Sequence, residues 1–471
     1  MIISNIKSKL SYLLFFVSVT AQAELPTTVV EALNKSAIPQ QSVAVYVQAV
    51  DEASPIINHN GDKSLNPASV MKLVTTNAAL DLLTPSYRWK TEVYRDGPLL
   101  NGVLNGNLII KGYGDPSFNA QEFWRLLMSL QQAGVKEIKG DFIIDKNFFA
   151  TNISNKKNFD DEVWRAYNAE PSAFLVNGRN TSFKFVVLDN LVKIYQEFEL
   201  PEVQIINNMT TTEGECGAWR SRFSYVVIPK KTGVAVTFNG KFSPSCGERY
   251  FELSVLDDEK YAFYIFKKLW RELGGKFSGM LKTQETSGSA IKIIEQLSDP
   301  LGYVVRDINK WSNNLMAKQL LLTIAAESNN PPASEAKGSL AVKTWLVSKG
   351  LEFDELVIEN GSGLSRIERI SAAHLGQVLV SAYNSTVMAE FIASLPILSQ
   401  DGTVMGRLKE GLANGRAHLK TGSLDGVSAI AGYVLDANHH RHVMVMMVNH
   451  NNAAASRNAQ DALIEWVHQQ P

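Results

Sequence analysis

The order of three differently patterned stretches is what most constrains the fold of this chain. Helix-like and strand-like patterns mix from residue 24 to about 86, and long helix-like patterns return after about 290. In between, short alternating strands are separated by Gly, Asn and Asp turns, and helical patterns interrupt them at 119–134 and 260–275. The sequence therefore predicts an α/β domain that is split by a β-rich insertion of about 200 residues.

Within the outer stretches, hydrophobic periodicity predicts a sheet and its covering helices. Residues 42–50 carry apolar side chains at every second position, which is typical of a half-buried strand. The apolar segment 70–83 predicts a buried helix, and the chain ends with paired strands within 426–450 and a helix over 457–470. These patterns favour a mixed fold of the α/β (α+β) kind.

The composition excludes several classes of protein. Lys and Arg number 46 against 47 Asp and Glu, a formal charge of −1, so no general attraction draws the 471-residue chain to nucleic acid. Apolar residues make up 45% and charged residues 20%, as in ordinary globular proteins, which argues against disorder and a coiled coil. Beyond the N-terminus, no apolar run approaches the roughly 18 residues that a membrane-spanning helix needs.

The first 23 residues resemble a secretory signal peptide. Lys7 and Lys9 supply the positive charge before an apolar core at 10–19, which is too short to span a bilayer. Ala21-Gln22-Ala23 fits an A-x-A cleavage site. The sequence therefore predicts export with cleavage before Glu24, which in a bacterium means the periplasm or the outer surface. The alternative is an uncleaved amphipathic anchor.

The chain contains two cysteines, Cys216 and Cys246, and export to an oxidising compartment makes them candidates for one disulfide. Closing a loop of this length would stabilise the fold by about 3 to 4 kcal/mol. The alternative is a pair of buried free thiols. Two cysteines exclude a disulfide-rich scaffold and a zinc site with four thiolate ligands.

A serine and a lysine three residues apart, Ser69 and Lys72, match the S-x-x-K pattern of serine acyl-transfer enzymes. These positions share one face of a helix, so the Lys72 amine can lie beside the Ser69 oxygen and take its proton. Pro67 favours a helix start here, where free N–H groups stabilise negative charge. The pattern occurs five times, but only Ser69 opens a strongly apolar helix, which can bury the lysine and keep it neutral.

A second pattern, S-x-N, is formed by Ser312 and Asn314 in a segment with an apolar side. The hydroxyl can relay a proton between a lysine and a leaving group. The carboxamide can reach both a lysine and a substrate carbonyl. The pattern is weak by itself, because it recurs in polar, turn-like or helix-end surroundings at four other serines: Ser64, Ser117, Ser328 and Ser456.

A third pattern is the K-T-G match of Lys420, Thr421 and Gly422, which Ser423 follows. The lysine offers a positive charge, and the Thr421 and Ser423 hydroxyls can bind a carboxylate. The glycine lets the backbone approach a ligand closely. The backbone N–H groups of Ser423 and Ser69 together form a candidate oxyanion hole.

With these motifs, the chain resembles the class C low-molecular-mass penicillin-binding proteins, which are D-alanyl-D-alanine carboxypeptidases and endopeptidases. The order of the motifs that begin at Ser69, Ser312 and Lys420 carries the resemblance, which covers essentially the whole mature chain. The long insertion between the first two motifs is itself a family trait. Further segments resemble side motifs of the family: 111–116, 360–366, 394–396 and 401–403.

The resemblance implies a penicillin-binding transpeptidase/β-lactamase-like domain, in which helices flank an antiparallel sheet, interrupted by a β-rich insertion of two domains. We expect the catalytic domain at 24–86 plus 288–471, insertion domain II at 87–170 plus 252–287, and a nested domain III at 171–251. The resemblance implies no cofactor and no metal.

By analogy with the family, Ser69 attacks the carbonyl carbon between two D-alanines and Lys72 is the base. Ser312 and Asn314 shuttle the proton and hold the substrate. Water then releases the acyl group, and β-lactams acylate Ser69 because their strained amide and carboxylate mimic the substrate. The terminal carboxylate is expected to be bound by three residues of the K-T-G segment: Lys420, Thr421 and Ser423.

Arg366 stands where the family uses an arginine to meet the side-chain carboxylate of the stem peptide. An acidic residue of the insertion resembles another family contact with that side chain, and Asp160 and Asp161 both fit. The sequence does not choose between them. A solvated loop charge is the alternative for either one.

The resulting prediction is an exported serine D-alanyl-D-alanine carboxypeptidase and DD-endopeptidase that acts on peptidoglycan stem peptides and crosslinks. Two alternatives are a serine β-lactamase or esterase of the same fold and a non-catalytic periplasmic wall-binding protein. The sequence leaves a homodimer open and allows at most peripheral contact between the last helix and a membrane. It does not fix the ratio of the two activities or the rate of deacylation.

Overall fold

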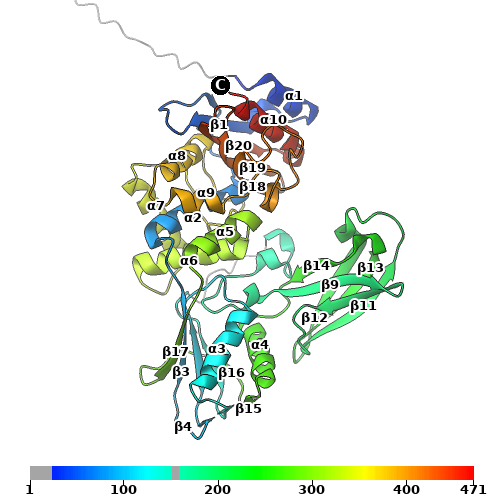
Figure 1. Cartoon of the computed structure of the whole chain (residues 1–471), viewed down its shortest axis with the longest axis vertical. Helices are drawn as coiled ribbons and strands as arrows, with labels where there is room; N and C mark the ends of the chain where they lie inside the picture. The colour runs from blue at the N-terminus through cyan, green and yellow to red at the C-terminus, as the bar shows by residue number, and fades with distance from the viewer. Residues whose placement is uncertain (1–23, 151–158, 471) are drawn as a thin grey trace, which may run out of the picture.

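The computed structural model describes residues 24–150 and 159–470. The signal peptide expected at residues 1–23 lies outside this range. No helix in the described part of the chain combines the length and the apolar character needed to cross a membrane. Figure 1 shows a helix-covered sheet that holds both ends of the described chain, with a β-rich part attached below it.

A five-stranded antiparallel sheet lies at the centre of the first part. Its order pairs β1, near the start of the chain, with β20, near its end, so the two outer stretches of the sequence form one unit. The strands, in order across the sheet, are β18 (Ala417–Leu424), β19 (Val427–Leu435), β20 (Arg441–Asn449), β1 (Val43–Ala49) and β2 (Ile57–His59).

Helices cover both faces of this sheet (Figure 1). One face packs against α1 (Thr27–Lys35) and α10 (Arg457–His468). The other face borders a core built from six helices, which also carries the motif residues: α2 (Lys72–Leu83), α5 (Leu301–Trp311), α6 (Asn314–Asn329), α7 (Glu335–Ser348), α8 (Ala372–Tyr383) and α9 (Met388–Ser394).

Strand β1 differs from the half-buried strand that its alternating pattern predicts. Val43, Val45 and Val47 pack in the core beneath α1 and α10, while Ala44 and Tyr46 pack in the core on the opposite face. All of β1 is buried because helices cover both faces of the sheet. Alternate side chains of β1 therefore point into two different hydrophobic cores, instead of one set pointing into a core and the other into water.

The β-rich part begins with β3 and returns through β17, which pairs with it. These two strands belong to a five-stranded sheet next to a smaller four-stranded one, and both pack with α3 (Ala120–Gln132) and α4 (Asp258–Glu272). The larger sheet runs β16 (Leu281–Thr283), β8 (Phe142–Asp145), β6 (Leu108–Gly112), β3 (Lys90–Arg95), β17 (Ile291–Leu297); the smaller runs β15 (Lys276–Phe277), β7 (Glu137–Ile138), β5 (Val103–Leu104), β4 (Leu99–Leu100).

Two three-stranded sheets project to one side of this part (Figure 1). A disulfide between Cys216 and Cys246 ties the segment before β12 to the segment after β13. The first sheet runs β10 (Leu191–Gln196), β9 (Thr181–Leu188), β14 (Arg249–Leu253), and the second runs β11 (Val203–Thr211), β13 (Val234–Phe242), β12 (Phe223–Pro229).

The mixed fold, with an antiparallel sheet flanked by helices and a β-rich insertion, is confirmed. The domain limits remain predictions. The pairing of β17 with β3 favours a return to the catalytic domain after Leu297, later than the expected residue 288.

Candidate active site

Ser69 lies in a tight 3₁₀ turn, Ala68–Met71, that leads into α2. The α-helix itself begins at Lys72, so the two residues are joined by the 3₁₀ turn and not by the first turn of an α-helix, as the sequence suggested. In a 3₁₀ turn, residues three apart lie almost directly above one another, which brings the two side chains together. Ala68 just before the serine has a φ of 46°, a left-handed conformation that costs an alanine energy.

The Lys72 amine is completely buried and has three oxygen neighbours. Its Nζ lies 3.0 Å from Ser69 Oγ and 2.6 Å from Asn314 Oδ1, and it also contacts the backbone carbonyl of Ser362. The carboxamide and carbonyl oxygens can only accept, so they take the two N–H groups of a neutral amine. The remaining lone pair then faces the Ser69 hydroxyl, which is the arrangement a general base needs.

The surroundings of Lys72 favour its neutral form. Burial holds the pKa of Lys72 well below its ordinary value, and the positive charges of Lys420 and Lys318 lower it further, against an opposing contribution from Glu368. Lys318 is buried one turn beyond Asn314 on α6. A neutral lysine next to a serine can accept its proton at neutral pH.

Ser312 and Lys420 form a second serine–lysine pair, in which the lysine is buried and the serine is partly exposed. Ser312 ends α5 in a left-handed conformation, with a φ of 57°. The Lys420 Nζ donates hydrogen bonds to Ser312 Oγ at 2.9 Å and to the Thr421 carbonyl at 2.7 Å. Burial lowers the pKa of Lys420 to about 7, so its proton can be exchanged near neutral pH.

Two glycines allow the backbone to close tightly around Ser69. A Cβ on Gly422 in β18 would come within 2.9 Å of the Ser69 nitrogen, and one on Gly363 would come within 1.9 Å of the Ala68 carbonyl oxygen. The K-T-G strand therefore lies directly against the nucleophile's turn. This places the Ser423 backbone on the strand that borders the Ser69 N–H, as an oxyanion hole requires.

Hydroxyl groups border the open side of the K-T-G strand. Thr421 Oγ1 lies 2.8 Å from Thr403 Oγ1, and Ser423 is exposed on the same strand. Thr403 belongs to the segment 401–403 that the sequence picked out as a side motif without assigning it a contact. Hydroxyls that both donate and accept can bind a carboxylate here.

Arg366 and Asp160 form an exposed ion pair, with Nη2 2.8 Å from Oδ1. Arg366 also donates to the Asp425 carbonyl at 2.8 Å and lies 4.8 Å from the ring centre of Phe159. The structure thus brings Arg366 of the catalytic part to the insertion. Of the two candidate acids, Asp160 is the one in contact with Arg366, while Asp161 follows it on the same exposed turn.

Sequence reasoning missed the group that supports Lys72 from behind. Glu368 is fully buried, and its Oε1 accepts hydrogen bonds from three successive N–H groups of residues 359–361. These bonds fix the turn whose Ser362 carbonyl contacts Lys72. Burial raises the pKa of Glu368. The motif 360–366 gave a signal, but nothing in its pattern shows that Glu368 folds back onto it.

The arrangement suits acyl transfer by a serine with a lysine base. Residues 25–470 match the model of the D-Ala-D-Ala carboxypeptidase 3 (S13) family. The chain is 26% identical to D-alanyl-D-alanine carboxypeptidase DacB of Haemophilus influenzae, across 95% of this chain and 93% of that one. It is also 26% identical to a D-alanyl-D-alanine carboxypeptidase of Actinomadura sp., across 82% and 74%.

The fold has a solved counterpart. The crystal structure of penicillin binding protein 4 from H. influenzae superposes with a TM-score of 0.79 at 23% identity, covering 94% of this chain and 99% of that one. The same protein has been solved in complex with a β-lactam. The chain belongs to the D-Ala-D-Ala carboxypeptidase 3 (S13) family, which confirms the resemblance to penicillin-binding serine peptidases.

Proposed function

We propose that the mature chain cleaves peptidoglycan stem peptides as a serine D-alanyl-D-alanine carboxypeptidase and DD-endopeptidase, with Ser69 as nucleophile and Lys72 as base. The proposal depends on the position of the buried Lys72 Nζ, which lies 3.0 Å from Ser69 Oγ. Its other two neighbours are oxygen atoms that can only accept hydrogen bonds. Ser69 loses its proton to Lys72 as Oγ bonds to the carbonyl carbon. The oxyanion is held by the N–H groups of Ser69 and Ser423.

The leaving amine receives its proton when the C–N bond breaks. The route runs from protonated Lys72 through the Ser312 hydroxyl, which accepts from Lys420 at 2.9 Å. Asn314, whose Oδ1 is 2.6 Å from Lys72, orients that amine and holds the substrate's amide. Water then attacks the acyl-enzyme and regenerates the Ser69 hydroxyl.

Lys420, Thr421 and Ser423 bind the carboxylate of the terminal D-alanine. The buried cation provides the charge, and the two hydroxyls provide directed hydrogen bonds on the exposed side of β18. The same contacts suit the carboxylate of a β-lactam, so we propose that β-lactams acylate Ser69. The β-lactam complex of the H. influenzae protein supports this transfer to the present chain.

Arg366 recognises the carboxylate on the side chain of the stem peptide, and Asp160 can meet an amine on the same side chain. The two groups lie 2.8 Å apart without substrate, so a ligand with both charges can replace their mutual ion pair. We further propose that the chain is exported to the periplasm by residues 1–23. A homodimer and peripheral membrane contact stay predictions.

Mass spectrometry of the intact mature protein after incubation with penicillin tests the proposal. One penicilloyl adduct is expected, on the peptide that contains Ser69, and Ser69→Ala should show none. Ser289→Ala is the matched control, because Ser289 starts another S-x-x-K match but lies exposed in a turn. Labelling of Ser69→Ala, or an adduct on another peptide, would contradict the proposal.

Crosslinked muropeptides separate the two activities. Release of terminal D-alanine from pentapeptides supports the carboxypeptidase, and conversion of dimers to monomers supports the endopeptidase. Unchanged dimers beside trimmed pentapeptides would remove the endopeptidase part. Rapid release of hydrolysed penicillin would favour a β-lactamase instead.

A further inference from the structure

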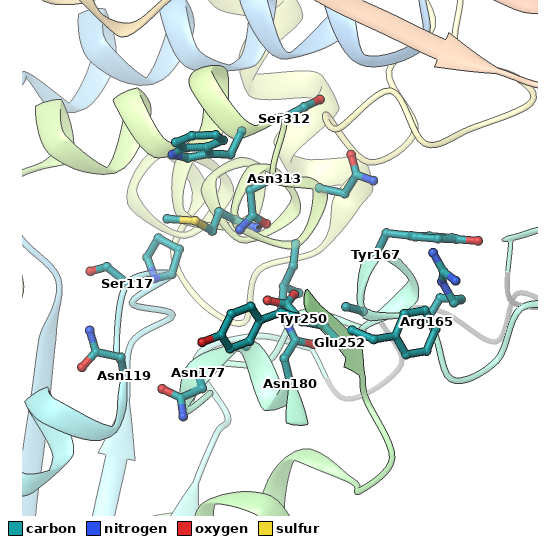
Figure 2. Close-up of a pocket in the computed structure, with 18 of the residues that line it drawn as sticks. Ser117, Asn119, Arg165, Tyr167, Asn177, Asn180, Tyr250, Glu252, Ser312 and Asn313 are labelled. Atoms are coloured by element: carbon teal, nitrogen blue, oxygen red, sulfur yellow. Dashed lines mark hydrogen bonds between the residues drawn. The ribbon is translucent and has the colours of Figure 1, made fainter. Parts of the chain in front are cut away.

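A cavity of about 740 Å³ lies between the catalytic residues and the β-rich insertion. One wall is the segment 311–316, which carries Ser312 and Asn314, and the remaining walls come from the insertion. Figure 2 shows Ser312 and Asn313 at one rim, with Asn180 and Tyr250 across the space from them. A volume of roughly 300 to 1,000 Å³ is typical of sites for small organic ligands.

Aromatic rings face this cavity without being packed away. Trp311 is 64% exposed and Tyr250 is 46% exposed, and Tyr167 contributes a third ring. Large rings that line a hollow while still open to water offer flat apolar faces and polar edges to a ligand. Figure 2 shows that Tyr250 and Tyr167 come from different segments of the insertion, and both residues line the cavity.

The polar groups of the cavity are mostly uncharged. Carboxamides that both donate and accept line it, together with two small hydroxyls: Asn119, Asn177, Asn180, Asn313, Asn314, Ser117 and Ser312. The charged side chains on its walls carry both signs: Arg165, Arg220 and Glu252. Arg165 is stacked near the rings of Tyr167 and Phe251, at 5.4 and 5.1 Å from their centres. Such a lining fits a ligand of hydroxyl and acetamido groups better than a highly charged one.

Continuity with the catalytic centre limits what the ligand can be. The cavity starts at Ser312 and Asn314, so its occupant is attached to the substrate being cleaved or lies beside it. The charged side chain of the stem peptide already has a site in the proposed function, at Arg366 and Asp160. Among the parts of the substrate that still lack a site, the N-acetylated glycan unit best matches a lining of carboxamides and aromatic rings.

We propose that this cavity binds an N-acetylated amino sugar of the peptidoglycan strand. The sugar lies against Tyr250 and the neighbouring carboxamides while the stem peptide extends to Ser69. The inference rests on the proposed function, because it assigns the cavity to the same substrate. It gives the insertion a second role in substrate binding, in addition to the contact proposed for Asp160.

Steady-state release of D-alanine from two substrates tests the assignment: a free pentapeptide and the same pentapeptide carrying its disaccharide. For the unmodified protein, we expect the disaccharide to lower KM by about three- to tenfold with kcat little changed. In Tyr250→Ala this advantage should disappear, while kinetics on the free pentapeptide stay unchanged. Equal KM values for the two substrates in the unmodified protein would overturn the assignment.

A matched control is available on the same sheet. Tyr195 on β10 is also 46% exposed and, like Tyr250, pairs with Lys184 of β9, but it does not line the cavity. Tyr195→Ala should keep the full advantage of the disaccharide. Loss of that advantage in both variants, or an equal rise in KM for both substrates in Tyr250→Ala, would contradict a sugar site at Tyr250.

Further measurements keep the outcomes distinct. Penicillin labelling at the normal rate shows that Tyr250→Ala is folded. Arg220→Gln is a second variant, because Arg220 is exposed on the cavity wall, and it should also reduce the KM advantage of the disaccharide substrate. A KM advantage for a sugar-free crosslinked peptide, and none for the disaccharide, would identify a peptide site and overturn the proposal. Failure to cleave any substrate would instead refute the proposed function, and the sugar site with it.

Discussion

The catalytic centre and the cavity beside it differ in how far water reaches their functional groups. Lys72 and Lys420 have no exposed surface, and their amines are held by oxygen atoms of the protein. In the cavity, Trp311 and Tyr250 keep 64% and 46% of their surfaces exposed. The two regions share the segment that carries Ser312, so the difference arises over a short distance.

This difference separates two physical tasks. Proton transfer needs amines whose pKa values are moved toward neutrality, and burial is the main cause of that shift for both lysines. Substrate selection needs surfaces that a large ligand can reach, which burial would prevent. Changes in the centre should therefore alter the chemical step, and changes in the cavity should alter KM for extended substrates.

The largest expected effect is on the buried base. Lys72→Met should lower the rate of penicillin acylation by about 10²- to 10⁴-fold, because no other group takes the Ser69 proton. The thermal midpoint should change little, because relief from burying an amine is offset by the loss of its hydrogen bonds to Asn314 and the Ser362 carbonyl. Lys318→Met is the matched control: it also removes a buried lysine near the centre but should keep most of the acylation rate. Equal acylation rates for Lys72→Met and the unmodified protein would show that Lys72 is not the base, and would contradict the assignment of proton transfer to the buried centre.

A smaller effect is expected from crowding the nucleophile's turn. Gly363 has a φ of 80°, and a Cβ there would lie 1.9 Å from the Ala68 carbonyl oxygen, so Gly363→Ala should cost about 3 kcal/mol of unfolding free energy and slow acylation. Gly350→Ala is the control, because its φ is 74° but no atom lies within 4 Å of the added carbon. It should cost only about 1 to 2 kcal/mol and leave acylation unchanged. Denaturant unfolding and penicillin labelling measure the two effects, and equal losses would show that the contact with Ala68 is unimportant.

The pH dependence of kcat/KM should reveal the two buried lysines. The rate of D-alanine release should rise on the acid side as Lys72 loses its proton, since the pKa of Lys72 is well below its ordinary value. It should fall above about pH 7, where Lys420 loses the charge that binds the substrate carboxylate, because the pKa of Lys420 is lowered to about 7. In Lys420→Arg the alkaline fall should vanish, because a guanidinium keeps its proton. A profile with no fall between roughly pH 7 and 9 would contradict a Lys420 whose pKa is lowered to about 7 and whose charge binds the substrate carboxylate.

The sequence predicted the motif residues because their signals are local. Ser69 and Lys72 are three residues apart, Ser312 and Asn314 two apart, and the third motif is continuous. The structure brings these three short segments together. The disulfide was equally accessible to prediction, because two cysteines can pair in one way. Short spacing and residue chemistry were sufficient to predict which residues form the site, but not the distances and hydrogen bonds between them.

Contacts between distant segments were beyond the sequence. Glu368 supports a turn next to Lys72, and Thr403 meets Thr421, yet neither position has a distinctive local pattern. The alternation of β1 was visible, but burial of both its faces depends on α1, α10 and α8, which reach it from elsewhere in the chain. Sequence patterns record which side chains face the same way, not what covers them.

The sequence by itself determined the class of fold, the three motifs and their order, because periodicity and fixed spacing are properties of a few neighbouring residues. The tertiary structure alone decided that Lys420 is buried beside Ser312, that Asp160 is the acid in contact with Arg366, and that a cavity joins Ser312 to the insertion. The physical reason is that burial, and the pKa shifts it causes, arise from the packing of segments far apart in the chain.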